Sequence, residues 1–369
     1  MYITKTNRDD DFSKEQWFWT RYLCHNTFVT KNPIELFTPF RALGVSNDKE
    51  ICEYILSDLT SETNKEMLNF LQASVIDANK YISKEAASKH ITASVAYTPI
   101  NMDKEKGIKK KHDFTIDVLN NDLFPHCKTQ TQKLYLLGYM ARKLIMVSFG
   151  WLPTDDRDSY INKRIELPGT LLNNLYRNYF NKLVKEMQKQ IIREINNGSW
   201  GSMDDYENII NMTNIYKIVK STTIENYIYR ALSTGDFSIK QSNSSKVGVT
   251  QVFNRLTYVA SLSHLHRINT PIEKSGELIA PRKLHHTTWG FLCAVETPEG
   301  QSIGIVKNIS YMAHITIPTN SNSLYEFILP QIICLDAENV KPKDVFGKVR
   351  VFINGAWVGV TNNMNFTQT

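Results

Sequence analysis

Apolar residues in the first part of the chain recur every three or four positions, which is the spacing of one face of an amphipathic helix. The capping sequence Ser46-Asn47, which Glu50 can complete, predicts a helix whose buried face carries Ile51, Ile55, Leu56 and Leu59. A second helix is predicted to carry Met67, Leu68 and Leu71. The capping-box pair Thr129 and Gln132 predicts a third helix, with Leu134, Leu137, Ala141, Leu144 and Ile145 at helical spacing.

Trp151-Leu152-Pro153 ends this third helix and marks a boundary in the chain. A long helix is then predicted from about Leu171 towards Ile195, with Gly198 placed as its C-terminal cap. Another helix covers about Ile224 to Leu232. The first two thirds of the chain are therefore predicted to be mostly helical.

The pattern changes after Gly235. The stretch from Val249 to Leu265 predicts a helix with one face formed by Gln251, Arg255, Tyr258 and Leu262. From Ile303 onwards we expect strands to dominate. Asn354-Gly355, between Val349–Ile353 and Ala356–Val360, predicts a two-residue hairpin with a type I′ turn. Because a lone hairpin is marginal in water, we expect the chain to stop inside a β domain.

Composition narrows the class of protein. Apolar residues make up 42% and charged residues 22%, so the chain can bury a core. The net charge of +6 is mild and does not demand a nucleic-acid partner. We expect no signal peptide and no membrane span, because the most apolar stretch carries Arg142 and Lys143 at its centre. Five scattered cysteines without a CxxC pair favour a reducing compartment over a disulfide framework.

The charged run from Asp103 to Lys111 is predicted to be a solvated loop, whose basic end could still contact phosphate. More specific chemistry lies between Lys246 and Asn308. Arg255, Arg267 and Arg282 can present planar, bidentate donors to phosphate, and Glu296 and Glu299 could orient them by ion pairing. A surface network of ion pairs explains the same residues equally well.

Metal binding is another candidate chemistry, for histidines of this region and for carboxylates earlier in the chain. His264, His266, His285 and His286 lie near Cys293, but they lack the paired spacing of structural zinc sites, so structural or phosphate-facing roles are favoured. The carboxylates of Asp155, Asp156 and Asp158 suggest magnesium, yet Asp156 and Arg157 are better explained as pairing or capping residues. We predict neither a catalytic set nor a metal site in this chain.

Several motifs in order resemble the second-largest, β-like subunit of multisubunit DNA-directed RNA polymerases, in its eukaryotic, archaeal and large-DNA-virus branch. They include Gly248-Val249-Thr250-Gln251-Val252-Phe253-Asn254-Arg255, Leu262-Ser263-His264-Leu265-His266-Arg267, Pro281-Arg282-Lys283-Leu284-His285 and Glu296-Thr297-Pro298-Glu299-Gly300-Gln301. Asp155-Asp156-Arg157-Asp158, with Asn162 to Gly169, continues the resemblance upstream. It covers about Ile34 to Val360.

The resemblance implies an α+β, multidomain internal piece of that subunit, with a largely helical lobe and protrusion portion followed by a mixed fork and a β-rich external region. The implied domains are an unassigned segment 1–33, a lobe-like region 34–160, the C-terminal part of the protrusion 161–235, the fork 236–315, and the truncated start of the external region 316–369. A full subunit of the family is roughly three times this length.

The resemblance also implies a function in transcription. The chain would line the active-centre cleft of the polymerase, a nucleotidyltransferase, and contact the DNA template, downstream DNA and the RNA–DNA hybrid. The residues facing nucleic acid or lying in fork loops would be Lys246, Arg255, His266, Arg267, Lys274 and Arg282. The residues holding the fork in place would be Gln251, Glu296, Glu299 and Gln301. His266 stands where the family usually has a basic residue, so its charge would depend on pH.

By the same resemblance the isolated chain is expected to be inactive and to bind no cofactor, since the largest subunit holds the Mg²⁺ of the assembled enzyme. Its partners would be that subunit and the remaining regions of the second subunit, and it would lie in the nucleus or, for a virus, in host cytoplasm or virion. Two alternative functions remain: a free-standing nucleic-acid-binding or assembly module, and a zinc hydrolase whose metal the histidines would bind. Steeply salt-dependent binding to single-stranded DNA would favour the first, and stoichiometric metal the second.

Overall fold

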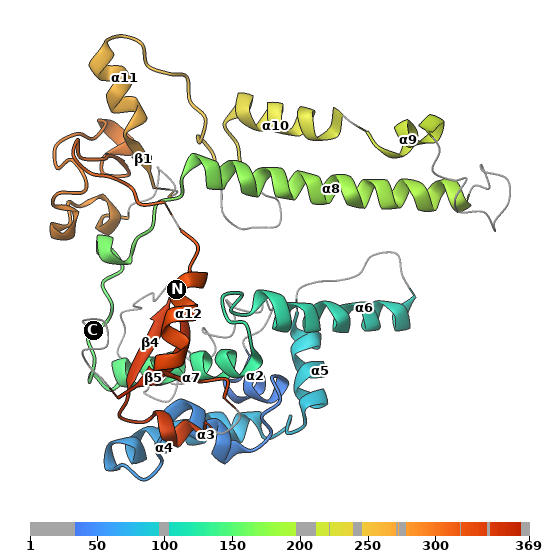
Figure 1. The fold of residues 1–369 in the computed structure, drawn as a ribbon, viewed down its shortest axis with the longest axis vertical. Helices are drawn as coiled ribbons and strands as arrows, with labels where there is room; N and C mark the ends of the chain where they lie inside the picture. The colour runs from blue at the N-terminus through green and yellow to red at the C-terminus, as the bar shows by residue number, and fades with distance from the viewer. Residues whose placement is uncertain are drawn as a thin grey trace. The chain divides into compact units, whose positions relative to one another are not determined.

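The computed structural model describes residues 34–95, 103–196, 212–220, 222–238, 246–270, 272, 278–317, 319–337 and 340–362. The chain forms two compact units (Figure 1). The first contains the described residues up to Thr154 together with those from Ile317 onwards, and the second runs from Asp155 to Thr316. The break at Thr154 falls at the boundary predicted from Trp151-Leu152-Pro153. The family names given to segments of the chain stay predictions.

The first unit is built mainly from helices around one apolar core. The helices are α2 (Phe37–Ala42), α3 (Asp48–Leu56), α4 (Glu62–Ala78), α5 (Lys84–Ser94), α6 (Lys104–Asp117), the π-helical turn η1 (Val118–Asp122) and α7 (Gln130–Ser148). Their core includes Phe37, Phe40, Ile51, Ile55, Met67, Leu71, Ile91, Leu123, Leu137 and Ile145. The helices predicted for α3, α4 and α7 are confirmed, although Leu59 lies beyond the end of α3.

Both predicted caps are present. The Asn47 side chain accepts a hydrogen bond from the Lys49 amide at 3.1 Å, and the Thr129 side chain accepts one from the Gln132 amide at 3.2 Å. The box at α7 closes differently from the expected pattern, because Gln132 Oε1 accepts from the amide of Lys128. Each cap satisfies a backbone donor that a helix start would leave unpaired.

Two buried cations stabilise this unit through backbone carbonyls. Arg41 donates from Nη1 to the carbonyls of Ala78 and Tyr81, and its Nη2 lies 2.5 Å from Asp48 Oδ1. Lys133 Nζ donates to the Leu119 and Asn120 carbonyls at 3.0 and 2.6 Å, and burial lowers the pKa of Lys133. Burying these charges is tolerated because each has polar partners at hydrogen-bonding distance.

The charged run from Asp103 to Lys111 is a helix start and not the predicted loop. Asp103 precedes α6, and the run occupies the first two turns of that helix. Lysine and glutamate are good helix formers, so the run needs little apolar periodicity to be helical. Lys109 and Lys110 are exposed, whereas Thr115 further along is buried.

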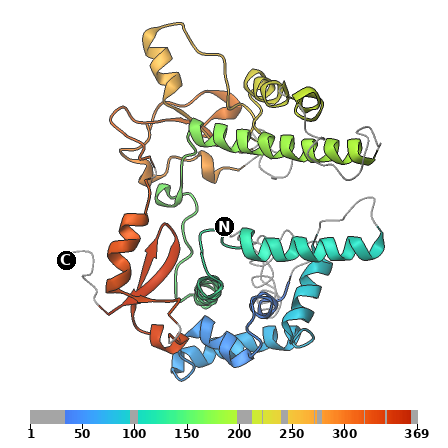
Figure 2. The same cartoon turned by 45° about the vertical axis from the view of Figure 1, so that its right-hand side comes forward.

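A three-stranded antiparallel sheet completes the first unit and packs against α7 (Figures 1 and 2). Its strand order is β3 (Ile333–Cys334), β5 (Ala356–Thr361), β4 (Val349–Ile353). Asn354 and Gly355 have φ of 50° and 83°, as a type I′ turn requires, so the predicted hairpin is confirmed. Tyr135 of α7 packs with Trp357, Leu335 and Val360 of the sheet region.

The prediction that strands dominate from Ile303 onwards is wrong. Between Ile303 and the hairpin the chain forms the short strand β2 (Val306–Asn308), α12 (Asn322–Ile328), the 3-10 turns η7 (Leu329–Gln331) and η8 (Pro342–Val345), and β3. Pro330 and Pro342 favour these turns, because proline fixes φ and lacks an amide donor for a sheet.

The second unit starts with a long helix. After the 3-10 turn η2 (Tyr160–Asn162) come α8 (Pro168–Asn196), α9 (Met212–Ile218) and α10 (Thr222–Thr234). Helices α8 and α10 lie side by side (Figure 1), and Leu175 of α8 packs with Ala231 of α10 and with Phe237. The helices predicted at 171–195 and 224–232 are confirmed, while Gly198 lies outside the described residues.

The rest of this unit is mostly irregular. It contains α11 (Tyr258–Leu265), β1 (Arg267–Asn269), the 3-10 turns η4 (Ala280–Arg282), η5 (His286–Thr288) and η6 (Gly300–Ser302), and β2. Strand β1 pairs antiparallel with β2, with Arg267 opposite Asn308. The predicted helix from Val249 is therefore wrong in its first half, because α11 begins only at Tyr258.

Taken together, the described residues have the expected mixed α+β architecture. No helix among them is long and apolar enough to cross a membrane. Within the same residues Cys52, Cys127, Cys293 and Cys334 are free thiols, and burial raises the pKa of Cys52 to about 11.

Candidate functional site

The predicted site residues lie in what we call the fork segment, residues 236–315. The two-stranded sheet β1–β2 is its centre, and a single bridge between Leu292 and Ile309 extends the pairing. Ile305, Val306 and Asn308 on or beside β2 are buried. This small core fixes the loops that carry the polar residues.

Gln251 does not lie on a helix face, and its side chain makes two hydrogen bonds within the fork segment. Its Nε2 donates to the Gly248 carbonyl at 3.0 Å, and its Oε1 lies 3.1 Å from Nε2 of His264 in α11. His264 Nδ1 accepts a hydrogen bond from the Asn254 amide at 3.1 Å. The Ser261 hydroxyl donates to the Asn254 carbonyl at 2.7 Å. Side chains of α11 thus bind both backbone groups of Asn254, so these groups are not engaged in helical hydrogen bonds.

Arg255 is exposed and lies over the ring of Phe253, with 4.6 Å between the guanidinium carbon and the ring centroid. Arg267, on β1, is also exposed. A guanidinium in either place can present several donors to an anion from solvent. His266, the C-cap of α11, is half-buried, and its carbonyl accepts from the Ile309 amide at 2.9 Å.

Arg282 is bound within the fork segment. Its Nη1 donates to the carbonyls of Gln301 and Ile303 at 2.7 and 3.0 Å. Gly304 lies so close that a Cβ atom there would overlap the Arg282 carbonyl oxygen. Arg282 and Gln301 therefore fasten the turn around η6 to η4, with Gln301 acting through its backbone.

The Glu-Thr-Pro-Glu-Gly motif forms a second set of ties, to β2 and α11. Glu296 accepts a hydrogen bond from the Ser263 hydroxyl, and its carbonyl accepts from Asn308 Nδ2 at 3.2 Å. Thr297 Oγ1 donates to the Val306 carbonyl at 3.1 Å and accepts from the Gly304 amide at 3.0 Å. Glu299 is exposed and precedes η6. Within the part of the chain that the structure describes, the Glu296 carboxylate is engaged by a hydroxyl and not by one of the expected arginine partners.

Lys246 forms an ion pair with Glu166, at 2.6 Å between Nζ and Oε2. The Phe237 amide also donates to the Lys246 carbonyl at 2.9 Å, and the Lys246 amide donates to Ser238 Oγ at 3.0 Å. The residues between Ser238 and Lys246, and also Lys274, lie outside the described residues.

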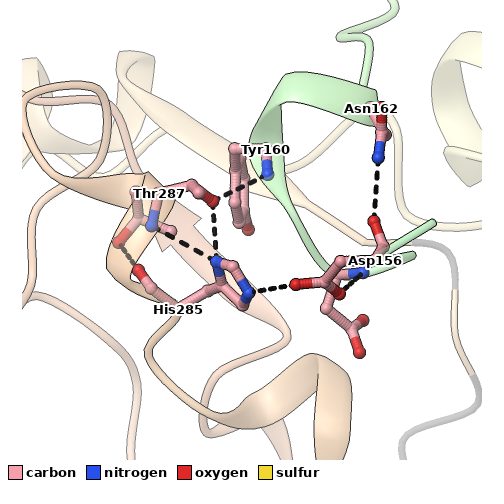
Figure 3. A network of polar contacts seen from close by, with 7 residues as sticks. Asp156, Tyr160, Asn162, His285 and Thr287 are labelled. Atoms are coloured by element: carbon pink, nitrogen blue, oxygen red, sulfur yellow. Dashed lines mark hydrogen bonds and ion pairs between the residues drawn. The ribbon is translucent and has the colours of Figure 1, made fainter. Parts of the chain in front are cut away.

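A network centred on His285 is the main feature that sequence reasoning did not predict (Figure 3). His285 Nε2 lies 2.7 Å from Asp156 Oδ2, and its Nδ1 lies 2.7 Å from Thr287 Oγ1. That hydroxyl oxygen also accepts from the Tyr160 amide at 2.9 Å. The network ties the Asp155–Asp158 motif to the Pro281–His285 motif, more than a hundred residues later.

The electrostatics of the network agree with a structural tie. The Asp158 amide and His285 hold the pKa of Asp156 below its usual value. Asp156 is therefore a pairing and capping residue, as the sequence suggested, and His285 has a satisfied structural role. Adjacent to it, Lys307 Nζ donates to the Pro281 carbonyl at 3.0 Å and lies over the Tyr160 ring, and burial lowers the pKa of Lys307.

The described residues contain no group of three or more histidine, cysteine, aspartate or glutamate side chains placed to hold a metal ion. Near the motif that suggested magnesium, the Asp156 carboxylate is already engaged by His285 and the Asp158 amide. The chemistry this site offers is thus exposed cations, Arg255 and Arg267, on a framework fixed by internal hydrogen bonds.

Comparison with known proteins gives two family matches in chain order. A model described as RNA polymerase Rpb2, domain 2 matches residues 11–166, and one described as RNA polymerase Rpb2, domain 3 matches residues 251–315. The second match covers most of the fork segment, and the first includes the Asp155–Asp158 motif.

Relatives match nearly the whole chain. It is 36% identical over 337 residues to DNA-directed RNA polymerase II subunit RPB2 of Encephalitozoon cuniculi, covering 90% of this chain and 28% of the relative. It is 34% identical over 340 residues to DNA-directed RNA polymerase II subunit 2 of Arabidopsis thaliana, covering 89% and 26%. It is 31% identical over 376 residues to DNA-directed RNA polymerase subunit 2 of Acanthamoeba polyphaga mimivirus, covering 95% and 30%. The chain thus spans between a quarter and a third of the length of these relatives.

Proposed function

Because the chain belongs to the family of second-largest subunits of DNA-directed RNA polymerases, we propose that it acts in transcription as part of such a subunit. The observation that carries this proposal is the order and extent of the matches, with domain 2 before domain 3 and about nine tenths of the chain aligned. The resemblance inferred from the motifs is confirmed at the level of the family.

In the assembled enzyme this chain lines the active-centre cleft and contacts the DNA template, downstream DNA and the RNA–DNA hybrid. The enzyme, a nucleotidyltransferase, joins nucleoside triphosphates by phosphodiester bonds, and Mg²⁺ held by the largest subunit supplies the metal chemistry. This chain contributes no catalytic residue and no cofactor site, and alone it is inactive. Its role is to bind and orient nucleic acid.

Arg255 and Arg267 make the direct contacts, with phosphates rather than base edges. Both are exposed, and phosphate contacts suit an enzyme that must read any template. Arg282 and Lys246 act differently, because their side chains are already bound to carbonyls and to Glu166. They hold the fork loops in the shape that meets nucleic acid. His266 directly precedes Arg267 in sequence, and it contributes a further contact, as does Lys274.

The partners are the largest polymerase subunit and the remaining regions of the second subunit. The compartment is the nucleus, or host cytoplasm or virion for a viral source. Relatives named as subunits of DNA-directed RNA polymerase II of a cellular organism and of a mimivirus polymerase support both settings.

The test uses a polymerase reconstituted with the complete second subunit that contains this chain. Arg267→Ala should slow elongation and weaken the open complex, and each lost phosphate contact should reduce the salt slope of DNA binding by about 1. Arg177→Ala removes an equal charge from an exposed position on α8 and should change neither. Unchanged elongation and salt slope in Arg267→Ala would contradict the assignment of that residue.

A second experiment tests whether the whole chain acts with a polymerase or independently of one. If this chain fails to co-purify with a largest subunit and yet binds single-stranded DNA with a steep salt slope, it is a free-standing binding module. If it assembles and restores transcription to a polymerase that lacks this segment, the proposal stands.

A further inference from the structure

We propose that His264 is the positioning residue of the fork segment, holding the stretch from Gly248 to Leu256 so that Arg255 is presented to nucleic acid. The hydrogen-bonding part of this inference rests on the geometry of the fork segment alone. The part that concerns nucleic acid rests on the proposed function. His264 has no assigned role in the contacts proposed above.

The partners of His264 fix its tautomer. Nδ1 lies 3.1 Å from the backbone nitrogen of Asn254, which can only donate, so Nδ1 carries no proton. A neutral imidazole then carries its proton on Nε2, which lies 3.1 Å from Gln251 Oε1. That oxygen accepts, so the amide nitrogen of Gln251 is free to donate to the Gly248 carbonyl at 3.0 Å. Every donor in this chain of three hydrogen bonds meets an acceptor.

The same ring also begins a stack that ends at Arg255. The rings of His264 and Phe253 are stacked, with centroids 5.7 Å apart and planes 18° from parallel. On the Phe253 ring lies the Arg255 guanidinium, 4.6 Å from its centroid. A guanidinium held by its face keeps its N–H donors at its edges, where phosphate oxygens can be bound.

The backbone of this stretch depends on side chains because it lacks regular structure. Helix α11 begins after Thr257, whose hydroxyl accepts from the Ala260 amide at 3.1 Å. Before it, the Asn254 amide is bound by His264 and the Asn254 carbonyl by Ser261. Removing the imidazole therefore removes an amide partner, the Gln251 partner and the base of the stack together.

Three variants of the full chain separate these contributions. His264→Ala removes all of them. His264→Asn places Oδ1 where Nδ1 was and keeps an acceptor for the Asn254 amide, whereas His314→Asn makes the same exchange at an exposed position outside the stretch. Hydrogen exchange should be about tenfold faster at the Asn254 amide in His264→Ala, close to unchanged in His314→Asn, and largely rescued in His264→Asn. In the unmodified chain, imidazole ¹⁵N shifts should show the Nε2–H tautomer.

The link to Arg255 is tested in the reconstituted polymerase. His264→Ala should reproduce the elongation defect of Arg255→Ala, and the double variant should be no slower than Arg255→Ala alone. Additive defects, or unchanged exchange at Asn254 in His264→Ala, would overturn the positioning role. If Arg255→Ala alone elongates normally, the nucleic-acid contact of Arg255 is wrong, while the exchange and tautomer results still decide whether His264 holds the stretch.

Discussion

Single polar side chains in the fork segment mostly bind the backbone of the fork segment itself. Arg282, Thr297 and Asn308 each donate to carbonyls at 2.7 to 3.2 Å. The sequence could predict that arginines here seek oxygen acceptors, but a carbonyl and a phosphate satisfy the same donors. Which acceptor Arg282 binds depends on how closely the backbone at Gly304 approaches the backbone of Arg282. No pattern in the sequence predicts the distance between these two backbone segments.

That close approach makes Gly304 the most sensitive glycine of the turn. Gly304→Ala should lower the unfolding free energy of the second unit by clearly more than the cost of backbone strain at its positive φ. The added Cβ would in addition overlap the Arg282 carbonyl oxygen. Gly300→Ala is the matched control, since it also has a positive φ of 77° but no atom near the added Cβ, and should cost about 1–2 kcal/mol. Unfolding in urea measures both, and equal losses would show that the packing against Arg282 is unimportant.

The Asp156–His285 tie predicts a pH dependence of stability. The folded-state pKa of Asp156 is lowered by the Asp158 amide and by His285. The contribution of the ionised Asp156 to the unfolding free energy is therefore fully present above about pH 4, and it is lost as the pH falls through the lowered pKa. Asp156→Asn should therefore be less stable than the unmodified chain at neutral pH, and the difference should shrink towards pH 3. Denaturant unfolding at several pH values checks this, with Asp113→Asn on α6 as the control. A difference that stays constant with pH would contradict the tie.

Whole elements could be predicted where apolar periodicity and caps agree. The helices α3, α4, α7, α8 and α10 were predictable because their buried faces repeat at helical spacing. The stretch from Val249 to Thr257 has a similar pattern yet is not helical, because Ser261 and His264 bind the backbone of Asn254. For α6 the error was the opposite one, a loop predicted where a helix forms, because its lysine-rich start has high helix propensity without an apolar face. The spacing of apolar residues alone reveals neither the hydrogen bonds to Asn254 nor the helix propensity of the lysines.

The contribution of a helix cap to stability can be tested at the N-terminus of α7. Thr129 Oγ1 accepts from the Gln132 amide at 3.2 Å, and its hydroxyl donates to Asp336 from the sheet region. Thr129→Ala should cost about 1 kcal/mol of unfolding free energy, because an N-cap and a tie to Asp336 are both lost. Thr129→Ser keeps the hydroxyl and should cost much less. Thermal unfolding distinguishes the two, and equal losses would mean that the methyl group matters more than the cap.

At the scale of the whole molecule, the described part of the fork segment carries several large apolar side chains that are almost fully exposed. Val252, Leu256 and Val295 are 95%, 88% and 86% exposed, and Trp289 is 84% exposed. In a chain that matches only part of longer relatives, regions outside the matched part can cover such side chains. From sequence alone these residues were indistinguishable from core residues, because hydrophobicity does not say which neighbour covers it.

The sheet and helices of the first unit are predicted to unfold together, although the second unit, Asp155 to Thr316, separates them in sequence. Trp357 is 3% exposed, packs with Tyr135 and Tyr139 of α7, and donates to the Gly359 carbonyl at 3.0 Å. Trp357→Ala should cost about 3–5 kcal/mol, as large core truncations do. Because the lost packing belongs to both elements, hydrogen exchange should accelerate in α7 and in β5 alike, while amides of α8 keep their rates.

Phe352→Ala is the matched control, since Phe352 lies on the same sheet and contacts Trp357 but is 40% exposed. It should produce a smaller loss and little change in α7. If Trp357→Ala accelerates exchange only in the hairpin, the sheet docks on a helical unit that is stable without it. If α7 and β5 respond together, the segment after Ile317 is an integral part of the first unit, and any shortened form of the chain that lacks it should lose the helices as well.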